Sequence, residues 1–206
     1  MLDFSNQILI YLLHAKEDIQ FTINSINTKL KLDSMASSKV TDSLKDNSLR
    51  LSSLKDSLEV SWLDSEIGEA GKHQAIKSDC KNISKLISKW HFFNCCDQLN
   101  NYIENHPDVK LISIMSGRFA RQILPLLSPR ENFHSAYVLT IDIKKNKEAL
   151  GVESKLKGVF NVEDELFGQL RNDLSALFWN EGKKLVASNR DQEAAEYFAE
   201  SQRLAK

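Results

Sequence analysis

Between residues 59 and 172, short apolar runs alternate with segments of helical periodicity, and this alternation constrains the fold more than any other feature of the chain. Continuous apolar runs are typical of strands that are buried on both faces, and helical segments between them supply the crossovers that parallel strands need. We expect strands at residues 59–64, 90–94, 109–115, 135–141 and 157–160. The pattern predicts an α/β fold with a doubly wound, parallel, five-stranded sheet in the flavodoxin-like order 2-1-3-4-5.

Helical periodicity fills the intervals between these strands. We expect helices at residues 76–89, 97–105, 118–127 and 144–155, and a long helix that begins at Glu163. Proline is predicted to stop the third helix near Pro125 and Pro129, and Gly151 to interrupt the fourth. The inward side of the first helix is predicted to carry Ile76, Ile83, Leu86 and Ile87.

The segment at residues 1–58 contains no glycine and no proline and has apolar side chains at helical spacing. These side chains are Ile19, Ile23, Ile26 and Leu30, followed by Leu44, Leu51, Leu54 and Leu58. A serine-rich stretch at residues 33–39 is predicted to break the helix. Two interpretations stay open: a helical hairpin that packs on the rest of the chain, or a coiled coil that pairs two copies as a homodimer.

Residues 173–206 are again predicted to be helical, with a spacing that resembles one tetratricopeptide repeat. The pattern consists of an aromatic residue, a glycine and a large apolar residue, then alanine and phenylalanine on a second helix: Phe178, Gly182, Leu185, Ala194 and Phe198. The turn is expected at residues 189–191, with Asp191 capping the second helix. An ordinary helical hairpin fits the pattern equally well. A single repeat cannot bury its apolar face alone, so it either packs on the α/β domain or begins an array.

Composition limits the function classes. Lys and Arg together number 27 against 28 Asp and Glu, so net charge provides no reason to expect a nucleic-acid partner. Cys80, Cys95 and Cys96 are an odd number with two adjacent, which fits free thiols of a reducing compartment. The apolar run at residues 8–13 is too short to cross a membrane, so we expect no membrane association and a cytoplasmic location. The five histidines show no metal-ligand spacing, and we expect no metal and no cofactor.

Ligands of doubly wound sheets bind at the carboxyl ends of the strands, so the residues that follow the predicted strands are the candidate site. They are Asp64, Ser116, Gly117, Arg118 and Thr140. The Ser116–Gly117–Arg118 turn is predicted to open a helix, whose free N–H groups and positive dipole end favour an anion such as phosphate or carboxylate. The alternative is that Ser116 only caps this helix and that Arg118 and Arg121 face water.

The same strand ends resemble those of the bacterial receiver domain. That family has an acidic pair after its first strand, a phospho-accepting Asp after the third, Ser or Thr after the fourth and Lys after the fifth. Asp64 matches an acidic position, with Glu66 close by, and Thr140 matches the hydroxyl position. The acceptor position holds Ser116 or Gly117, and the Lys position holds Asn161. The resemblance implies a receiver-like fold that has lost its phosphotransfer chemistry.

Several short sequence segments between residues 59 and 172 resemble those of an N-terminal module of large animal multidomain proteins. They are Trp62-Leu63-Asp64, Ile114-Met115-Ser116-Gly117, Ile123-Leu124-Pro125, His134-Ser135-Ala136-Tyr137-Val138 and Lys157-Gly158-Val159-Phe160. In those proteins tetratricopeptide repeats follow the module, and often an arginine-specific ADP-ribosyltransferase domain. That transferase needs an arginine, a Ser-x-Ser motif and a Glu-x-Glu motif in one fold, and we do not expect this chain to carry that enzyme. The resemblance implies a regulatory or docking module.

These observations leave three functional hypotheses. The first is a non-catalytic protein-interaction or regulatory module in signalling or scaffolding, which contacts another protein or neighbouring repeats through Phe178, Leu185 and Phe198. The second is a ligand-binding domain or an enzyme that binds a small anionic or nucleotide-like ligand at the strand ends. The third is a structural coiled-coil component based on residues 1–58. We expect no complete set of catalytic residues.

Overall fold

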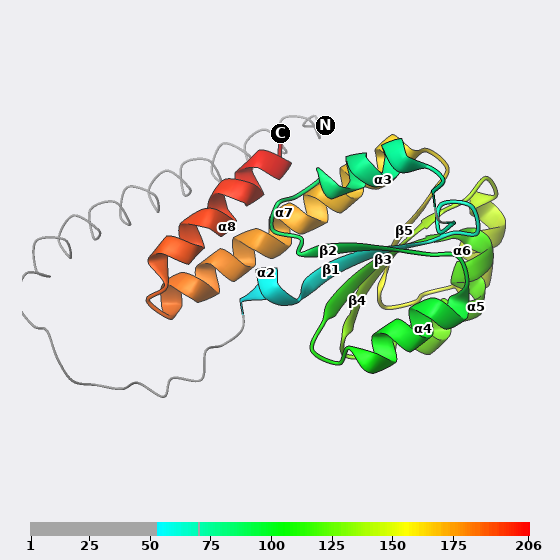
Figure 1. Ribbon diagram of the computed structural model, residues 1–206, viewed down its shortest axis with the longest axis horizontal. Helices are drawn as coiled ribbons and strands as arrows, with labels where there is room; N and C mark the ends of the chain where they lie inside the picture. Colours follow the sequence, from blue (N-terminus) through cyan, green and yellow to red (C-terminus); the bar gives the residue numbers. More distant parts are fainter. Residues whose placement is uncertain (1–52, 70) are drawn as a thin grey trace, which may run out of the picture. The chain divides into compact units, whose positions relative to one another are not determined.

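The computed structural model describes residues 53–69 and 71–206, and these form the unit considered below (Figure 1). Five parallel strands form one sheet in the order β2-β1-β3-β4-β5, which confirms the predicted topology. The strands are β1 (Leu58–Leu63), β2 (Lys89–Phe93), β3 (Lys110–Ser116), β4 (Phe133–Leu139) and β5 (Leu156–Phe160). Each begins within two residues of its expected start, because continuous apolar runs identify strands buried on both faces.

Helices cover both faces of this sheet. They are α2 (Leu54–Ser57), α3 (Gln74–Lys81), α4 (Cys96–Asn105), α5 (Gly117–Leu127), α6 (Ile143–Leu150), α7 (Glu163–Ala187) and α8 (Asp191–Leu204). Helices α3 and α7 lie on one face, and α4 and α5 lie on the other, with α6 beside α5 (Figure 1). On the α7 face, Trp62 is 1% exposed and its ring meets that of Phe167 at 5.9 Å. On the opposite face, Leu63 and Met115 of the strands pack with Leu124 of α5.

The helix expected at residues 76–89 is wrong at its carboxyl end, because α3 stops at Lys81. The following residues bond to α8 instead of continuing the helix. The Ser84 hydroxyl donates to Glu200 at 2.7 Å and accepts from the Leu86 amide at 3.2 Å, and Arg203 donates to the Ile83 carbonyl. Side-chain bonds to backbone compete with helix formation, and here they come from a distant part of the chain. Of the four predicted inward side chains, Ile83, Leu86 and Ile87 are nonetheless buried, and Ile76 is half-buried.

Helix α5 ends at Leu127, as predicted, between Pro125 and Pro129, and its Leu124 and Leu127 are fully buried. Two further expectations need correction. Asp191 does not cap α8; it is the first helical residue, and Arg190 occupies the cap position without a side-chain cap bond. Leu58, expected on a helix, begins β1. Gly151 does end α6, where its φ of +55° favours glycine.

Helix α7 runs as one element through the expected boundary at residues 172 and 173 and continues past the sheet to pair with α8 (Figure 1). Between the two helices, the rings of Phe178 and Tyr197 lie 5.8 Å apart. A Cβ atom on Gly182 would come within 2.6 Å of the Phe198 ring, so glycine is needed for this close approach. The predicted C-terminal hairpin is therefore present.

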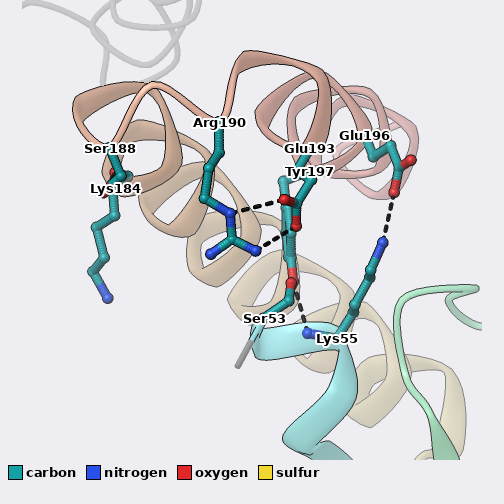
Figure 2. Close-up of polar contacts among 8 residues, drawn as sticks. All are labelled: Ser53, Lys55, Lys184, Ser188, Arg190, Glu193, Glu196 and Tyr197. Atoms are coloured by element: carbon teal, nitrogen blue, oxygen red, sulfur yellow. Dashed lines mark hydrogen bonds and ion pairs between the residues drawn. The ribbon is translucent and has the colours of Figure 1, made fainter. Parts of the chain in front are cut away.

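Polar contacts tie this hairpin to the α/β domain. Figure 2 shows Tyr197 of α8 next to Lys55 of α2 and to Ser53, the residue that precedes α2. The buried Tyr197 hydroxyl lies 2.8 Å from the Ser53 hydroxyl and accepts a 2.7 Å bond from the Lys55 amide. The Lys55 ammonium group also meets Glu196 at 3.2 Å. The hairpin thus packs on the α/β domain, which is one of the two arrangements expected for a single repeat. The remaining expectations for residues 1–52 lie outside the described residues.

A buried carboxylate lies near the start of β1. Glu59 is 2% exposed, and its Oε2 atom accepts bonds from the Tyr102 hydroxyl and, at 2.7 Å, from His91 Nε2. Lys89 approaches the other carboxylate oxygen at 3.3 Å. Burial works to raise the pKa of Glu59, but the bonds from Tyr102 and His91 outweigh it and hold this pKa below its ordinary value. The buried carboxylate of Glu59 therefore has three polar partners: Tyr102, His91 and Lys89.

Candidate functional site

A cleft of about 580 Å³ lies at the carboxyl ends of the strands. All five predicted ligand residues line it: Asp64, Ser116, Gly117, Arg118 and Thr140. They come from the ends of β1, β3 and β4, which parallel pairing places along one edge of the sheet. The juxtaposition follows directly from the strand order, and Asn161 at the end of β5 joins the same lining.

Asp64 is fixed by the turn that follows β1. Its Oδ1 atom accepts bonds from the amides of Glu66 at 2.8 Å and Ile67 at 3.2 Å. This arrangement is an Asx-type turn, in which the side chain orders the backbone that follows it. No bond to the second carboxylate oxygen is formed within the described residues. Glu66 does not line the cleft.

Gly117 begins α5 at the floor of the cleft. A Cβ atom there would lie 2.6 Å and 2.7 Å from the amide atoms of Asn146 and 2.7 Å from the Thr140 hydroxyl. Any larger residue would therefore force α5 away from α6. Ser116 is at the cap position with its side chain making no cap bond, so the expectation that it simply caps the helix is not met. The first amides of α5 consequently keep their capacity to bind an anion.

Asn146 is a site residue that the strand-end reasoning missed. It is 2% exposed on α6, donates to Thr140 Oγ1 at 3.0 Å and to the Asp142 carbonyl at 2.8 Å, and accepts a short bond from Arg121. Its position was available in the sequence, because Ile143, Asn146 and Leu150 fall on one helical face and an amide on such a face requires partners. Asn146 holds α5 and α6 together beneath the cleft.

The cations around the cleft are not paired with carboxylates. Arg118 and Lys145 are exposed and Arg121 is half-buried; all three line the cleft, and none forms an ion pair with another residue of the described ranges 53–69 and 71–206. In contrast, Arg130 and Arg203 each pair with a glutamate. The expectation that both cleft arginines simply face water is wrong for Arg121, which bonds to Asn146.

Carboxylates also line the cleft, but two of the three are engaged by backbone groups. Asp64 orders its turn, and Asp142 accepts a bond from the Lys145 amide at 3.0 Å and so caps α6. Glu163 lies in the first turn of α7. Thr140 accepts bonds from Asn146 and from the Asp142 amide, and its own proton has no acceptor among the described residues. The Thr140 hydroxyl can therefore donate to a ligand, as can the side chains of Arg118 and Lys145.

The three residues predicted to contact a partner lie elsewhere. Phe178 is 0% exposed, Leu185 4% and Phe198 3%, all between α7 and α8. The Trp179 ring packs beside Phe198 at 4.6 Å. The structure brings these residues together, but inside the hairpin, where they hold its two helices to each other. A partner-binding surface on the hairpin would consist of side chains other than these three.

Other chemistry is limited in the part of the chain that the structure describes. There, no group of three or more His, Cys, Asp or Glu side chains is placed to hold a metal ion. Burial raises the pKa of the Cys80 thiol to about 12, and burial also raises the pKa of Cys96, so neither is an activated nucleophile.

The strand order and the position of the cleft define the class: a doubly wound parallel α/β domain of flavodoxin-like or receiver-like topology, with a C-terminal helix pair. Comparisons with known proteins go no further, because no family model, no curated protein and no solved structure matches this chain.

Within residues 53–69 and 71–206, no helix is both long enough and apolar enough to cross a membrane.

Proposed function

We propose that this chain is a non-catalytic regulatory module that binds a small anionic ligand in the cleft at the strand ends. The observation that carries the proposal is the set of three cationic side chains, Arg118, Arg121 and Lys145, which line one cleft and have no ion-pair partner within the described residues. The first hypothesis drawn from the sequence was protein interaction through Phe178, Leu185 and Phe198 of the C-terminal hairpin. The burial of Phe178, Leu185 and Phe198 shifts the preference to the cleft.

The local backbone supports the same ligand chemistry. Helix α5 is eleven residues long, and its amino end opens into the cleft with no side chain in the capping position bonded to it. Gly117 brings the backbone close to whatever occupies this space. An anion there would meet backbone N–H groups, a guanidinium group and the Thr140 hydroxyl proton, which together suit a phosphate or a carboxylate.

The receiver resemblance supports binding without phosphotransfer. The positions that correspond to acceptor and lysine, Ser116 or Gly117 and Asn161, line the cleft together with Asp64 and Thr140. Without an acceptor carboxylate no acyl phosphate can form, and without the lysine its charge would lack a partner. We therefore propose reversible binding as the activity of this cleft.

Thermal unfolding of the purified chain tests the proposal. The probes are inorganic phosphate, ATP and NAD, each compared with potassium chloride at the same ionic strength. A ligand at about 100 times its dissociation constant stabilises a fold by roughly 2.7 kcal/mol, a shift that melting curves resolve. We expect stabilisation by at least one probe, and loss of it in Arg118→Ala.

Arg171→Ala is the matched control, because Arg171 is an exposed arginine of α7 that does not line the cleft. It should respond to the probes as the unaltered chain does. Equal loss in both variants would show that general charge, not the cleft, attracts the anions. Absence of any shift beyond that of potassium chloride would overturn the proposal.

Protein interaction remains a second candidate, favoured by the packing of Phe198 over Gly182, two residues of the repeat-like spacing. This packing, together with sequence segments such as Ile114-Met115-Ser116-Gly117, supports similarity to the N-terminal module of animal multidomain proteins. The outer side of α8 exposes Ala195, Glu196 and Ala199. If neighbouring repeats dock there, Ala199→Arg should abolish binding of a fragment that carries them, whereas Arg118→Ala should not.

The coiled-coil hypothesis predicts a dimer in solution. Its test compares the sedimentation of the full chain with that of residues 51–206. The truncation has to stop before Ser53, since Ser53 and Lys55 bond to Tyr197 and β1 begins at Leu58. A dimer that becomes a monomer supports the hypothesis, and an unchanged state contradicts it.

A further inference from the structure

One exposed apolar side chain lines the cleft, and a second belongs to a loop that contributes to the lining. Within residues 53–69 and 71–206, the large hydrophobic side chains that remain exposed are Leu126, Ile141, Val152 and Val162. Ile141 is 99% exposed and is part of the cleft lining; Val162 is 45% exposed and lies between Asn161 and Glu163, both of which line the cleft. Ile141 thus lines the cleft that also holds the unpaired cations Arg118, Arg121 and Lys145, and Val162 is next to two of its lining residues in the sequence.

Strand register brings the two side chains to neighbouring loops. Leu139 of β4 pairs with Phe160 of β5, and the Thr140 amide donates to the Phe160 carbonyl at 2.8 Å. Ile141 lies two residues after Leu139, and Val162 lies two residues after Phe160. Because the strands are parallel, both residues leave the sheet at the same edge.

The loop that carries Ile141 is held in place by its neighbours. The Asp142 amide donates to Thr140 Oγ1 at 3.3 Å, Asp142 caps α6, and Thr140 is bonded to the buried Asn146. Ile141 is therefore presented to solvent between two anchored residues. An apolar side chain fixed outward at the mouth of a polar cleft gains free energy only when something apolar covers it.

We infer that the ligand is a small organic anion in which the charged group is joined to an apolar group. The charged group binds among Arg118, Lys145 and the amino end of α5, and the apolar group covers Ile141 and Val162. This inference rests on the proposed function and extends it from the charge of the ligand to its chemical class. Ligand sites commonly combine an apolar contact with a few placed polar groups in this way.

The test compares three phosphates of increasing apolar content by calorimetry: inorganic phosphate, glycerol phosphate and phenyl phosphate. We expect phenyl phosphate to bind about tenfold more tightly than glycerol phosphate, which has a similar charge. In Ile141→Ser this preference should fall to about threefold or less, while the affinity for inorganic phosphate stays unchanged. Thermal unfolding without ligand checks that the variant is folded, as expected for a side chain that is 99% exposed.

Val152→Ser is the matched control, since Val152 is fully exposed on the loop after α6 and does not line the cleft. It should leave all three affinities unchanged. Equal affinities for phenyl and glycerol phosphate, with inorganic phosphate still bound, would overturn this inference and leave the proposed function standing. If none of the three phosphates binds, the inference fails, and the melting curves with ATP and NAD decide the proposed function separately. A preference for phenyl phosphate that survives Ile141→Ser would also overturn the inference.

Discussion

The two ends of strand β1 place charged groups in opposite circumstances. Near its start, Glu59 is buried and receives bonds from Tyr102, His91 and Lys89. Just beyond its end, the cleft collects cations that are accessible and have no carboxylate partner among the described residues. A buried charge must be paired within the protein, because its desolvation is otherwise unfavourable. An exposed charge is hydrated by water, so it needs no partner within the protein and can bind a ligand. The comparison separates a group that stabilises the fold from groups that are free to bind.

The largest expected effect comes from removing one partner of the buried carboxylate. Tyr102→Phe keeps the ring between His91 and His106 but deletes the hydroxyl that donates to Glu59. Hydrogen bonds to charged groups contribute about 1.5–3 kcal/mol, so we expect the free energy of unfolding in urea at neutral pH to fall by about 2–3 kcal/mol.

Arg118→Ala is the counterpart at the other end of the strand. Without ligand it should change the free energy of unfolding by no more than about 0.5 kcal/mol, as is usual for exposed positions. Similar losses in the two variants would remove the distinction between a stabilising cluster and a binding cleft.

A smaller effect is expected at the floor of the cleft. Gly117→Ala places a methyl group against Asn146 and Thr140, and because such overpacking costs roughly 1–3 kcal/mol, we expect destabilisation of about 1–2 kcal/mol. The same substitution at Gly168 of α7 meets nothing within 4 Å and should stabilise the helix by up to about 1 kcal/mol. Urea unfolding of both variants measures the difference. If Gly117→Ala leaves the free energy of unfolding unchanged, Asn146 and Thr140 do not pack tightly against Gly117.

The sequence was sufficient for the sheet but not for these polar details. Apolar runs such as Leu111–Met115 identify strands by composition alone, and topology rules then bring Asp64, Ser116 and Thr140 to one edge. The end of α3 could not be predicted, because it depends on Glu200 and Arg203, more than one hundred residues later. Asn146 depends likewise on partners from two other elements. Long-range polar bonds leave no periodic pattern in a sequence.

The smallest expected effect is the pH dependence that Glu59 gives to stability. Its pKa is lower in the folded chain than the ordinary value of 4.5, so its ionised form stabilises the fold at pH values above 4.5. This contribution should be lost as the pH falls below 4.5 and through the folded pKa, because the proton then binds the unfolded chain more tightly. Glu59→Gln lacks the titrating group and should lose less stability on acidification than the unaltered chain, as measured by urea unfolding at neutral and acidic pH. Glu148→Gln, which alters an exposed carboxylate of α6, should leave the acid dependence as it is. If both variants follow the unaltered chain, the Glu59 cluster does not couple proton binding to folding, and the contrast between the two ends of β1 would then lie in burial alone.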